Sequence, residues 1–171
     1  MGKRTLKRRR RENRTDYKTR QLLLLSKVPR IVVRITNKYF ILQAVDSMEA
    51  QDKVIVTITS KELLKNGWDS NAKGSLKSIP AGYLTGLLFA KKLKGGKYIV
   101  DLGMVRTIAG SRAFAVVNGL VDGDLNISAN KSVFPSKERL NGEHLKNELK
   151  DMISNVHKNV SSSVIEKEKA K

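Results

Sequence analysis

Residues 30–45 read RIVVRITNKYFILQAV, and this stretch decides the fold. Apolar and more polar side chains alternate through its first half, which is the period of a strand that covers a core with one face. Asn37-Lys38 predicts a two-residue hairpin turn, because asparagine tolerates a positive φ. Residues 39–45 form the return strand, so the stretch predicts an antiparallel hairpin with one covered side.

On the C-terminal side of this hairpin, the pattern predicts a mixed sheet with helices. The expected elements, in order, are a polar loop at 46–52, a strand at 53–59, a helical turn at 60–66 capped by Ser60, a loop at 68–79, a helix opened by Pro80 and ended by Gly95-Gly96, a buried strand at 97–102, and a helix capped by Ser111 and closed by Gly123. A helix between the third and fourth strands permits a right-handed crossover. We therefore predict an α/β fold of the mixed α+β kind, a three-layer-like mixed sheet of about four main strands with packed helices.

The C-terminal part of the chain predicts a helical extension. Its helical pattern opens at Pro135-Ser136, and its apolar stripe consists of Leu145, Leu149, Met152, Ile153 and Val156. Such a stripe belongs to a helix that docks on the body or binds a partner. Residues 161–171 have no pattern that forms a core, and we expect them to be disordered.

The N-terminal segment is dense in positive charge. Ten of the eighteen residues from 3 to 20 are lysine or arginine, and only Glu12 and Asp16 oppose them. Repulsion between these charges predicts an extended, mobile arm in the isolated protein. A surface of closely spaced phosphates would order the arm, because neutralising them releases condensed counterions.

Residues 17–26 predict a short helix between the arm and the body. Thr15 or Asp16 can cap its N-terminus, and a proline stops the helix after its leucine run. We expect the leucines to dock on the body. Arg14 and Lys18 are expected to share one helical face, at a spacing that suits successive phosphates.

Composition points to a polyanionic partner. The chain has 171 residues, a net charge of +18 and 40% hydrophobic residues, and the part after residue 20 is basic as well. A basic run is also typical of nuclear-localisation signals and solubilising tails, but a basic body favours nucleic acid. The absence of cysteine excludes disulfides and thiolate zinc sites. No signal-peptide core follows the first charges, and the run of four leucines is too short to span a bilayer.

These patterns divide the chain into four parts. They are a flexible basic RNA-binding arm at 1–14, an α/β RNA-binding domain at 15–127, a C-terminal helical extension at 128–160 and a disordered tail at 161–171.

A collinear set of short motifs runs from the arm to about residue 150. The motifs are Arg8-Arg9-Arg10-Arg11-Glu12, Thr15-Asp16-Tyr17, Pro29-Arg30, Ile35-Thr36-Asn37-Lys38, Tyr83-Leu84-Thr85-Gly86-Leu87, Gly110-Ser111-Arg112, Phe134-Pro135-Ser136 and Gly142-Glu143-His144. Together they resemble the large-subunit ribosomal protein L-eighteen family in its archaeal form. The tail after about Lys150 departs from the family pattern, and nothing is carried onto it.

The resemblance implies a structural protein of the cytoplasmic ribosome, with an α/β sandwich shared with a small-subunit ribosomal protein. It implies binding of 5S rRNA and its anchoring in the central protuberance of the large subunit. The implied partners are 5S rRNA, adjacent large-subunit rRNA and neighbouring ribosomal proteins. We expect no cofactor, no metal, no membrane contact and no small-molecule substrate.

Two kinds of RNA contact are expected from these residues. The arm would follow backbone phosphates, for which the planar guanidinium fork is suited, and turns of the body would recognise RNA shape. The predicted RNA-binding residues are Lys3, Arg4, Lys7, Arg8, Arg9, Arg10, Arg11, Arg14, Tyr17, Lys18, Arg20, Arg34, Asn37, Lys38, Tyr39, Gly110, Ser111 and Arg112. Lys73 and Lys77 are further phosphate contacts of low specificity, and Trp68 is interpreted as a packing residue.

Other functions fit parts of the sequence. The strand order also matches a ribonuclease H-like nuclease, with Asp101, Asp122 and Asp124 near its metal positions, but the first strand lacks a carboxylate. His144 and His157 have no third ligand at a metal spacing. A ribosome-assembly factor or a DNA-binding factor remains open, because charge alone does not distinguish phosphate polymers.

Overall fold

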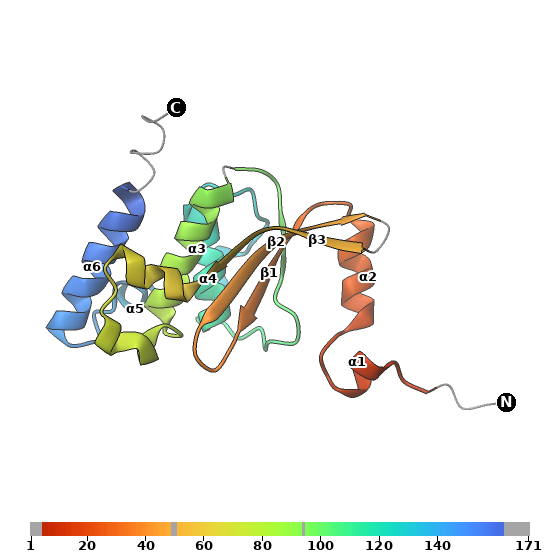
Figure 1. The fold of residues 1–171 in the computed structure, drawn as a ribbon, viewed down its shortest axis with the longest axis horizontal. Coiled ribbons are helices and arrows are strands. Elements are labelled where there is room, and N and C mark those ends of the chain that lie inside the picture. The colour runs from red at the N-terminus through yellow and green to blue at the C-terminus, as the bar shows by residue number, and fades with distance from the viewer. Residues whose placement is uncertain (1–4, 49–50, 94, 163–171) are drawn as a thin grey trace.

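A four-stranded mixed sheet lies at the centre of the molecule (Figure 1). The structure is a computed structural model that describes residues 5–48, 51–93 and 95–162. The strands are β1 (Arg30–Ile35), β2 (Phe40–Met48), β3 (Gln51–Thr59) and β4 (Ile99–Asp101). Their spatial order is β3-β2-β1-β4; β1 pairs antiparallel with β2 and parallel with β4, and β2 pairs antiparallel with β3. This arrangement confirms the predicted α/β fold with a mixed sheet.

The β1–β2 hairpin confirms the predicted turn but not its reason. Ile35 pairs with Phe40, and the Thr36 hydroxyl donates to the Tyr39 carbonyl oxygen at 2.6 Å. The same hydroxyl oxygen accepts the Tyr39 amide at 3.0 Å. Asn37 does not have a positive φ, so the Thr36 side chain, not a left-handed asparagine, holds the turn.

The second hairpin is longer than predicted. The expected polar loop at 46–52 is mostly strand, because β2 continues to Met48 and β3 begins at Gln51. Ser47 faces Asp52 across the hairpin, and its hydroxyl donates to the carboxylate at 2.8 Å. Cross-strand partners of this kind let polar residues remain in a strand.

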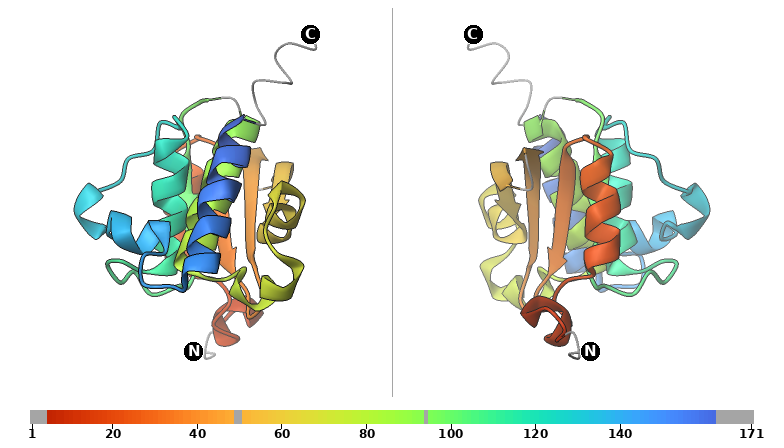
Figure 2. Two further views of the ribbon diagram at one scale, coloured as in Figure 1. Left: turned by 90° about the vertical axis from the view of Figure 1, so that its left-hand side faces the viewer. Right: turned by 90° about the vertical axis from the view of Figure 1, so that its right-hand side faces the viewer.

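Three long helices form the core with the sheet, and they are α3 (Ile79–Leu93), α4 (Arg112–Asp122) and α6 (Asn147–Ser162). Figure 2 shows α6 running alongside α3. Their buried side chains meet those of the sheet in one cluster that includes Ile31, Val33, Phe40, Leu42, Ile58, Leu84, Leu87, Val116, Leu120, Ile153, Val156 and Val160. The alternation in residues 30–36 therefore predicted the buried face of β1 correctly.

Helices α3 and α4 are in backbone contact at glycines. A Cβ atom on Gly86 would overlap the carbonyl oxygen of Val116, and one on Gly119 would overlap that of Tyr83. The start of α3 lies against the start of α4, since Gly82 is next to Arg112. The two helices therefore run parallel, and their N-termini lie at the same end of the body.

Several local predictions need correction. Ser60 lies buried inside the 3-10 helix η1 (Ser60–Asn66) instead of capping it, and its hydroxyl bonds the Phe40 amide at 3.1 Å and the Leu76 carbonyl at 2.8 Å. The predicted buried strand at 97–102 is the half-exposed edge strand β4. The segment at 68–79, predicted to be a loop, contains a second 3-10 helix, η2 (Ser70–Ser75). Trp68 is a packing residue as predicted, with 3% of its surface exposed.

The C-terminal helix docks on the body, which was one of the two predicted alternatives. It follows η3 (Lys131–Val133) and α5 (Lys137–Asn141), and its buried residues are Ile153, Val156 and Val160. The Lys91 ammonium donates to the last carbonyls of α6, those of Val160 and Ser161, at 2.9 and 3.1 Å. The expected disordered tail begins inside α6, which reaches Ser162, and its remainder lies outside the described residues.

Candidate nucleic-acid interface

The described part of the basic arm is less extended than predicted. Residues Arg8–Arg11 form one helical turn, α1, and none of its side chains is buried. Glu12 lies within ion-pair distance of Arg8 (3.9 Å) and Arg14 (3.4 Å), and the Arg9 Nε donates to the Thr15 hydroxyl at 2.8 Å. These contacts reduce the repulsion that favours an extended chain. Two of the predicted contacts, Lys3 and Arg4, lie outside the described residues.

The predicted helix after the arm is α2 (Tyr17–Leu25). Asp16 is its N-cap: one carboxylate oxygen accepts the Lys18 amide at 3.0 Å, and the other accepts the Thr19 hydroxyl at 2.6 Å. The hydrogen bond from Thr19 is the main cause that lowers the pKa of Asp16. Because the helix begins after Asp16, Arg14 precedes it and does not share a helical face with Lys18, so that prediction was wrong.

The leucines of α2 dock on the body only in part. Leu23 and Leu24 are half-buried, whereas Leu22 and Leu25 are 61% and 69% exposed. Besides this partial apolar packing, ionic contacts join α2 to the sheet.

These ionic contacts join α2 to the sheet through the Asp52 carboxylate on β3. The Arg20 guanidinium donates to the Asp52 carboxylate at 2.8 Å, and the Arg30 guanidinium approaches the same oxygen at 2.7 Å. Arg30 has 5% of its side chain exposed and also donates to the Ser47 hydroxyl at 2.9 Å. Partial burial alone would raise the pKa of Asp52, but hydrogen bonds from Arg20, Ser47 and Arg30 outweigh it and lower the pKa to about 2.

Asp101 extends this network to the other edge of the sheet. Its carboxylate lies 3.2 Å from Arg34 and 3.9 Å from Arg30, and it accepts the Gly103 amide at 2.8 Å. The hydrogen bond from the Gly103 amide confirms the prediction that Asp101 is a strand-end residue that binds nearby backbone amides. The carboxylate is neutralised by two guanidinium groups, which is unlike a metal ligand of a nuclease.

The sequence did not predict the role of Arg30, Ser47 or Asp52. The sequence did contain one indication of this role. Arg30 begins a strand of a covered sheet, and an arginine at such a position needs a charged partner. The sequence did not say which acid supplies it, since Asp52 was placed in a loop.

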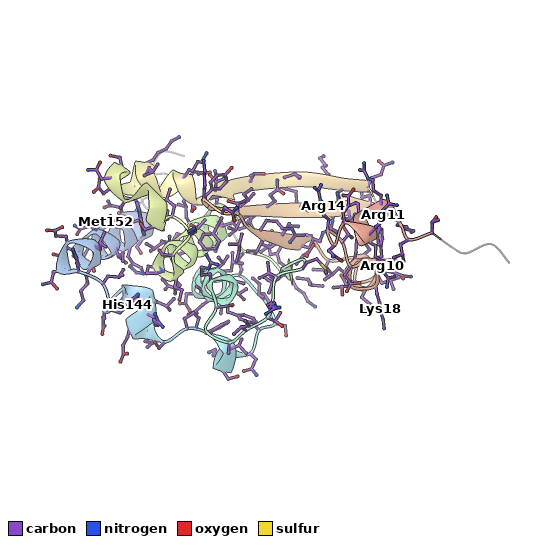
Figure 3. The ribbon with its side chains drawn as sticks, turned by 90° about the horizontal axis from the view of Figure 1, so that it is seen from below. Arg10, Arg11, Arg14, Lys18, His144 and Met152 are labelled. Carbon is purple, nitrogen blue, oxygen red and sulfur yellow. The ribbon has the colours of Figure 1, made fainter. Side chains whose placement is uncertain are left out.

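Four cations of the arm and α2 gather at one end of the molecule (Figure 3); they are Arg10, Arg11, Arg14 and Lys18. Arg10, Arg11 and Lys18 are exposed and form no ion pair with any described residue. The Lys7 ammonium lies 4.7 Å from the centre of the Tyr17 ring. Exposed cations that gather on one surface are an arrangement that can neutralise polymer phosphates.

A small cavity of about 100 Å³ lies beside Arg14, one of these cations. Arginines from the arm, from α2 and from β1 line it, and they are Arg9, Arg14, Arg20 and Arg34. The predicted contacts Arg20 and Arg34 thus belong to this cluster, and both already form ion pairs inside the protein.

The remaining predicted contacts lie in two other places. Asn37 and Lys38 are exposed at the β1–β2 turn, and Tyr39 beside them is half-buried under the Lys61 ammonium, 4.5 Å from its ring centre. Gly110-Ser111-Arg112 precede and open α4 and line a different cavity together with His144. His144 lies at the far end of the molecule from the arm cations (Figure 3). The predicted residues therefore lie at three places in the fold and not at one.

Asp122 and His157 have structural partners. Asp122 accepts the Tyr83 hydroxyl at 3.0 Å, and burial together with this carboxylate raises the pKa of Tyr83 to about 12. The His157 ring stacks on Tyr83 with a centroid distance of 6.2 Å. In residues 5–48, 51–93 and 95–162, no three acidic or histidine side chains form a group that could hold a metal ion. None of the helices described there has the length and apolar run needed to span a bilayer.

We expect Asp52→Asn to destabilise the fold by about 2 kcal/mol near pH 6, because it leaves the buried Arg30 without its closest carboxylate. The depressed folded-state pKa of about 2, against 3.8 for an ordinary aspartate, stabilises the fold above pH 4 and stops doing so as the pH falls towards 2. Urea unfolding at pH 6 and pH 2.5 measures both effects, and the difference between the two proteins should shrink in acid.

Asp124→Asn is the matched control for this substitution. Asp124 is exposed, forms no ion pair with any described residue and has a positive φ that asparagine also tolerates. Equal unfolding free energies for all three proteins at pH 6 would contradict the role given to Asp52.

Comparison with known proteins places this arrangement in a family. The family model for "Ribosomal large subunit proteins 60S L5, and 50S L18" matches residues 3–97. The large ribosomal subunit protein uL18 of Methanoregula boonei is 45% identical over 141 residues, which are 81% of this chain and 79% of that protein. The protein of the same name from Methanospirillum hungatei is 39% identical over 160 residues, 92% of this chain and 89% of the relative. The chain therefore belongs to the family of the ribosomal large-subunit proteins 60S L5 and 50S L18, which is a family of structural proteins and not of enzymes.

Proposed function

We propose that this protein binds 5S rRNA and anchors it in the central protuberance of the large ribosomal subunit. The observation that carries the proposal is the set of exposed cations Arg10, Arg11 and Lys18, which form no ion pair with any described residue. The Arg20–Asp52–Arg30 network joins α2, the helix that carries Lys18, to the sheet. Ribosomal relatives of similar length make a structured RNA the natural polyanion for that surface.

The arginines of α1 and the β1–β2 turn of the body contribute differently to RNA binding in this proposal. Arg10 and Arg11 protrude from a short helical turn, where each planar guanidinium can hold two phosphate oxygens. Such contacts supply affinity with little choice of sequence. Choice of a particular RNA comes from shape, which the rigid body presents through the exposed β1–β2 turn at Asn37 and Lys38.

The Arg20–Asp52–Arg30 network has a functional consequence in this proposal. A mobile arm loses conformational entropy when it binds, whereas an arm that begins from a fixed α2 loses less. Arg20 therefore serves as a positioning residue when it is paired with Asp52, and the unpaired Lys18 on the same helix contacts RNA.

The dependence of affinity on salt tests the phosphate contacts. If about six phosphates are neutralised, the logarithm of the association constant should fall with the logarithm of salt concentration at a slope of roughly −4 to −5. Filter binding or fluorescence anisotropy with 5S rRNA between about 0.1 and 0.5 M salt measures this slope. A slope near zero would contradict binding through the cationic surface.

A further inference from the structure

A cavity of about 340 Å³ is lined by residues of α3, α4, α5 and α6 and of the segment that leads into α5. Its volume falls within the range of about 300–1,000 Å³ that is typical of small-molecule sites. Helix α6 lies at the opposite end of the molecule from α1 and α2 (Figure 1). The cavity is therefore separate from the cations of the arm.

Aromatic rings form part of the cavity wall. Tyr83 on α3 and His157 on α6 stack with their ring planes 3° from parallel and their centroids 6.2 Å apart. Phe134, which precedes α5, is half-buried and lines the cavity with them. Aromatic faces favour flat, π-bonded ligands, because such ligands stack on them.

Polar groups without hydrogen-bond partners lie beside these rings. Asn118 is half-buried and Asn141 is exposed, and neither carboxamide has a hydrogen bond with any described residue. Asp122 accepts the Tyr83 hydroxyl with its Oδ2 atom at 3.0 Å, whereas its Oδ1 atom has no partner among the same residues. A carboxamide offers both a donor and an acceptor. The cavity thus combines flat walls with unused donors and acceptors.

The charges at the cavity distinguish between two kinds of flat ligand. Lys137 lines the cavity, is exposed and forms no ion pair with any residue that the structure describes. An arginine side chain of a partner protein could pair with Asp122, but the Lys137 ammonium would repel it. A nucleotide suits both charges, because its base can carry amino donors for the carboxylate and its phosphate is an anion.

We propose that this cavity binds one unstacked nucleobase, and, resting on the function proposed above, that the base belongs to the bound RNA. The base stacks on the aromatic wall, and the carboxamides of Asn118 and Asn141 form hydrogen bonds with its edge. The Oδ1 atom of Asp122 accepts a hydrogen bond from an exocyclic amino group, which adenine, cytosine and guanine carry and uracil lacks. The Lys137 ammonium contacts a neighbouring phosphate.

The first test uses the monophosphates of adenosine, cytidine, guanosine and uridine and NMR of the full chain. Cytidine monophosphate should shift the ring resonances of Tyr83 and His157 in a saturable way, and uridine monophosphate should bind about tenfold more weakly. The variant Asn118→Ala should bind cytidine monophosphate about tenfold more weakly, and alanine is compatible with helix α4. The matched control Asn155→Ala removes an exposed helical carboxamide outside the cavity and should bind like the wild type.

Two results would overturn the nucleobase site. The first is the absence of a saturable shift of the two rings with all four nucleoside monophosphates. The second is a saturable shift with N-acetylarginine methylamide and none with the nucleotides, which would assign the cavity to an arginine of a partner protein. Equal affinities for cytidine and uridine monophosphate would contradict the contact assigned to Asp122.

The second test identifies the source of the base. Stacking and base-edge hydrogen bonds release no counterions, so Asn118→Ala should weaken binding of 5S rRNA by about tenfold at every salt concentration and leave the log–log salt slope unchanged. A less steep slope would contradict a base contact. Saturable shifts with nucleotides but an unchanged affinity for RNA would overturn the RNA assignment in favour of a free nucleotide. Absence of any RNA binding by the wild type would overturn the proposed function, whereas the NMR result would still decide the cavity.

Discussion

Deletion of residues 1–14 should lower the affinity for 5S rRNA by roughly three orders of magnitude at about 0.1 M salt, while the body should stay folded. The deleted segment holds eight of the basic residues and one acidic residue, Glu12. The described part of this segment makes its contacts with Thr15, Tyr17 and its own residues, so its loss removes little packing. Anisotropy titrations with labelled RNA measure the affinity, and thermal melting checks the fold.

The salt dependence separates loss of charge contacts from loss of structure. At about 1 M salt, where counterion release contributes little, the truncated and complete proteins should bind almost equally. A control that replaces Lys65, Lys131, Lys146 and Lys158 with glutamine removes exposed charge elsewhere and should cost much less affinity. Loss of cooperative melting on truncation would contradict the division between arm and body.

Replacement of Gly119 by alanine should destabilise the protein by about 3 kcal/mol. Alanine favours a helix interior over glycine by about 1 kcal/mol, so without a contact the substitution would stabilise α4. Its methyl group, however, would overlap the carbonyl oxygen of Tyr83, a backbone atom that cannot rotate away. The two helices must then separate, which opens the core around Val116 and Leu120. Urea unfolding followed by circular dichroism measures the change.

Gly74→Ala is the control for that experiment. Gly74 is exposed, and nothing lies within 4 Å of the position that its Cβ would occupy. We expect its unfolding free energy to change by less than about 0.5 kcal/mol. Equal unfolding free energies for Gly119→Ala and Gly74→Ala would contradict the backbone contact that we assign between α3 and α4.

The alternating and helical patterns predicted most of the fold because burial dictates them. The period of two in residues 30–36 placed Ile31 and Val33 in the core, and the helical stripe of residues 145–156 placed Ile153 there. The cap at Asp16 was also predictable, since it depends only on residues within one turn.

What the sequence did not predict depends on contacts between distant residues. Residues 46–48 and 51–52 extend a hairpin because Arg30, Ser47 and Asp52 satisfy one another across three strands. The grouping of Lys77, Ser111 and His144 around one cavity likewise follows from the parallel packing of two helices, which no local pattern specifies. For the arm, high charge density predicted extension, but Glu12 and Thr15 supply local partners that permit a helical turn.

Competition between nucleic acids tests whether the protein selects 5S rRNA over other phosphate polymers. Labelled 5S rRNA bound to the full chain at about 0.15 M salt, a typical physiological value, is displaced with unlabelled 5S rRNA or with duplex DNA of equal length. Phosphate contacts alone would make the two competitors equivalent. We expect half displacement to need about tenfold more DNA than 5S rRNA, or more. Equal potency of the two competitors would contradict specific binding of 5S rRNA.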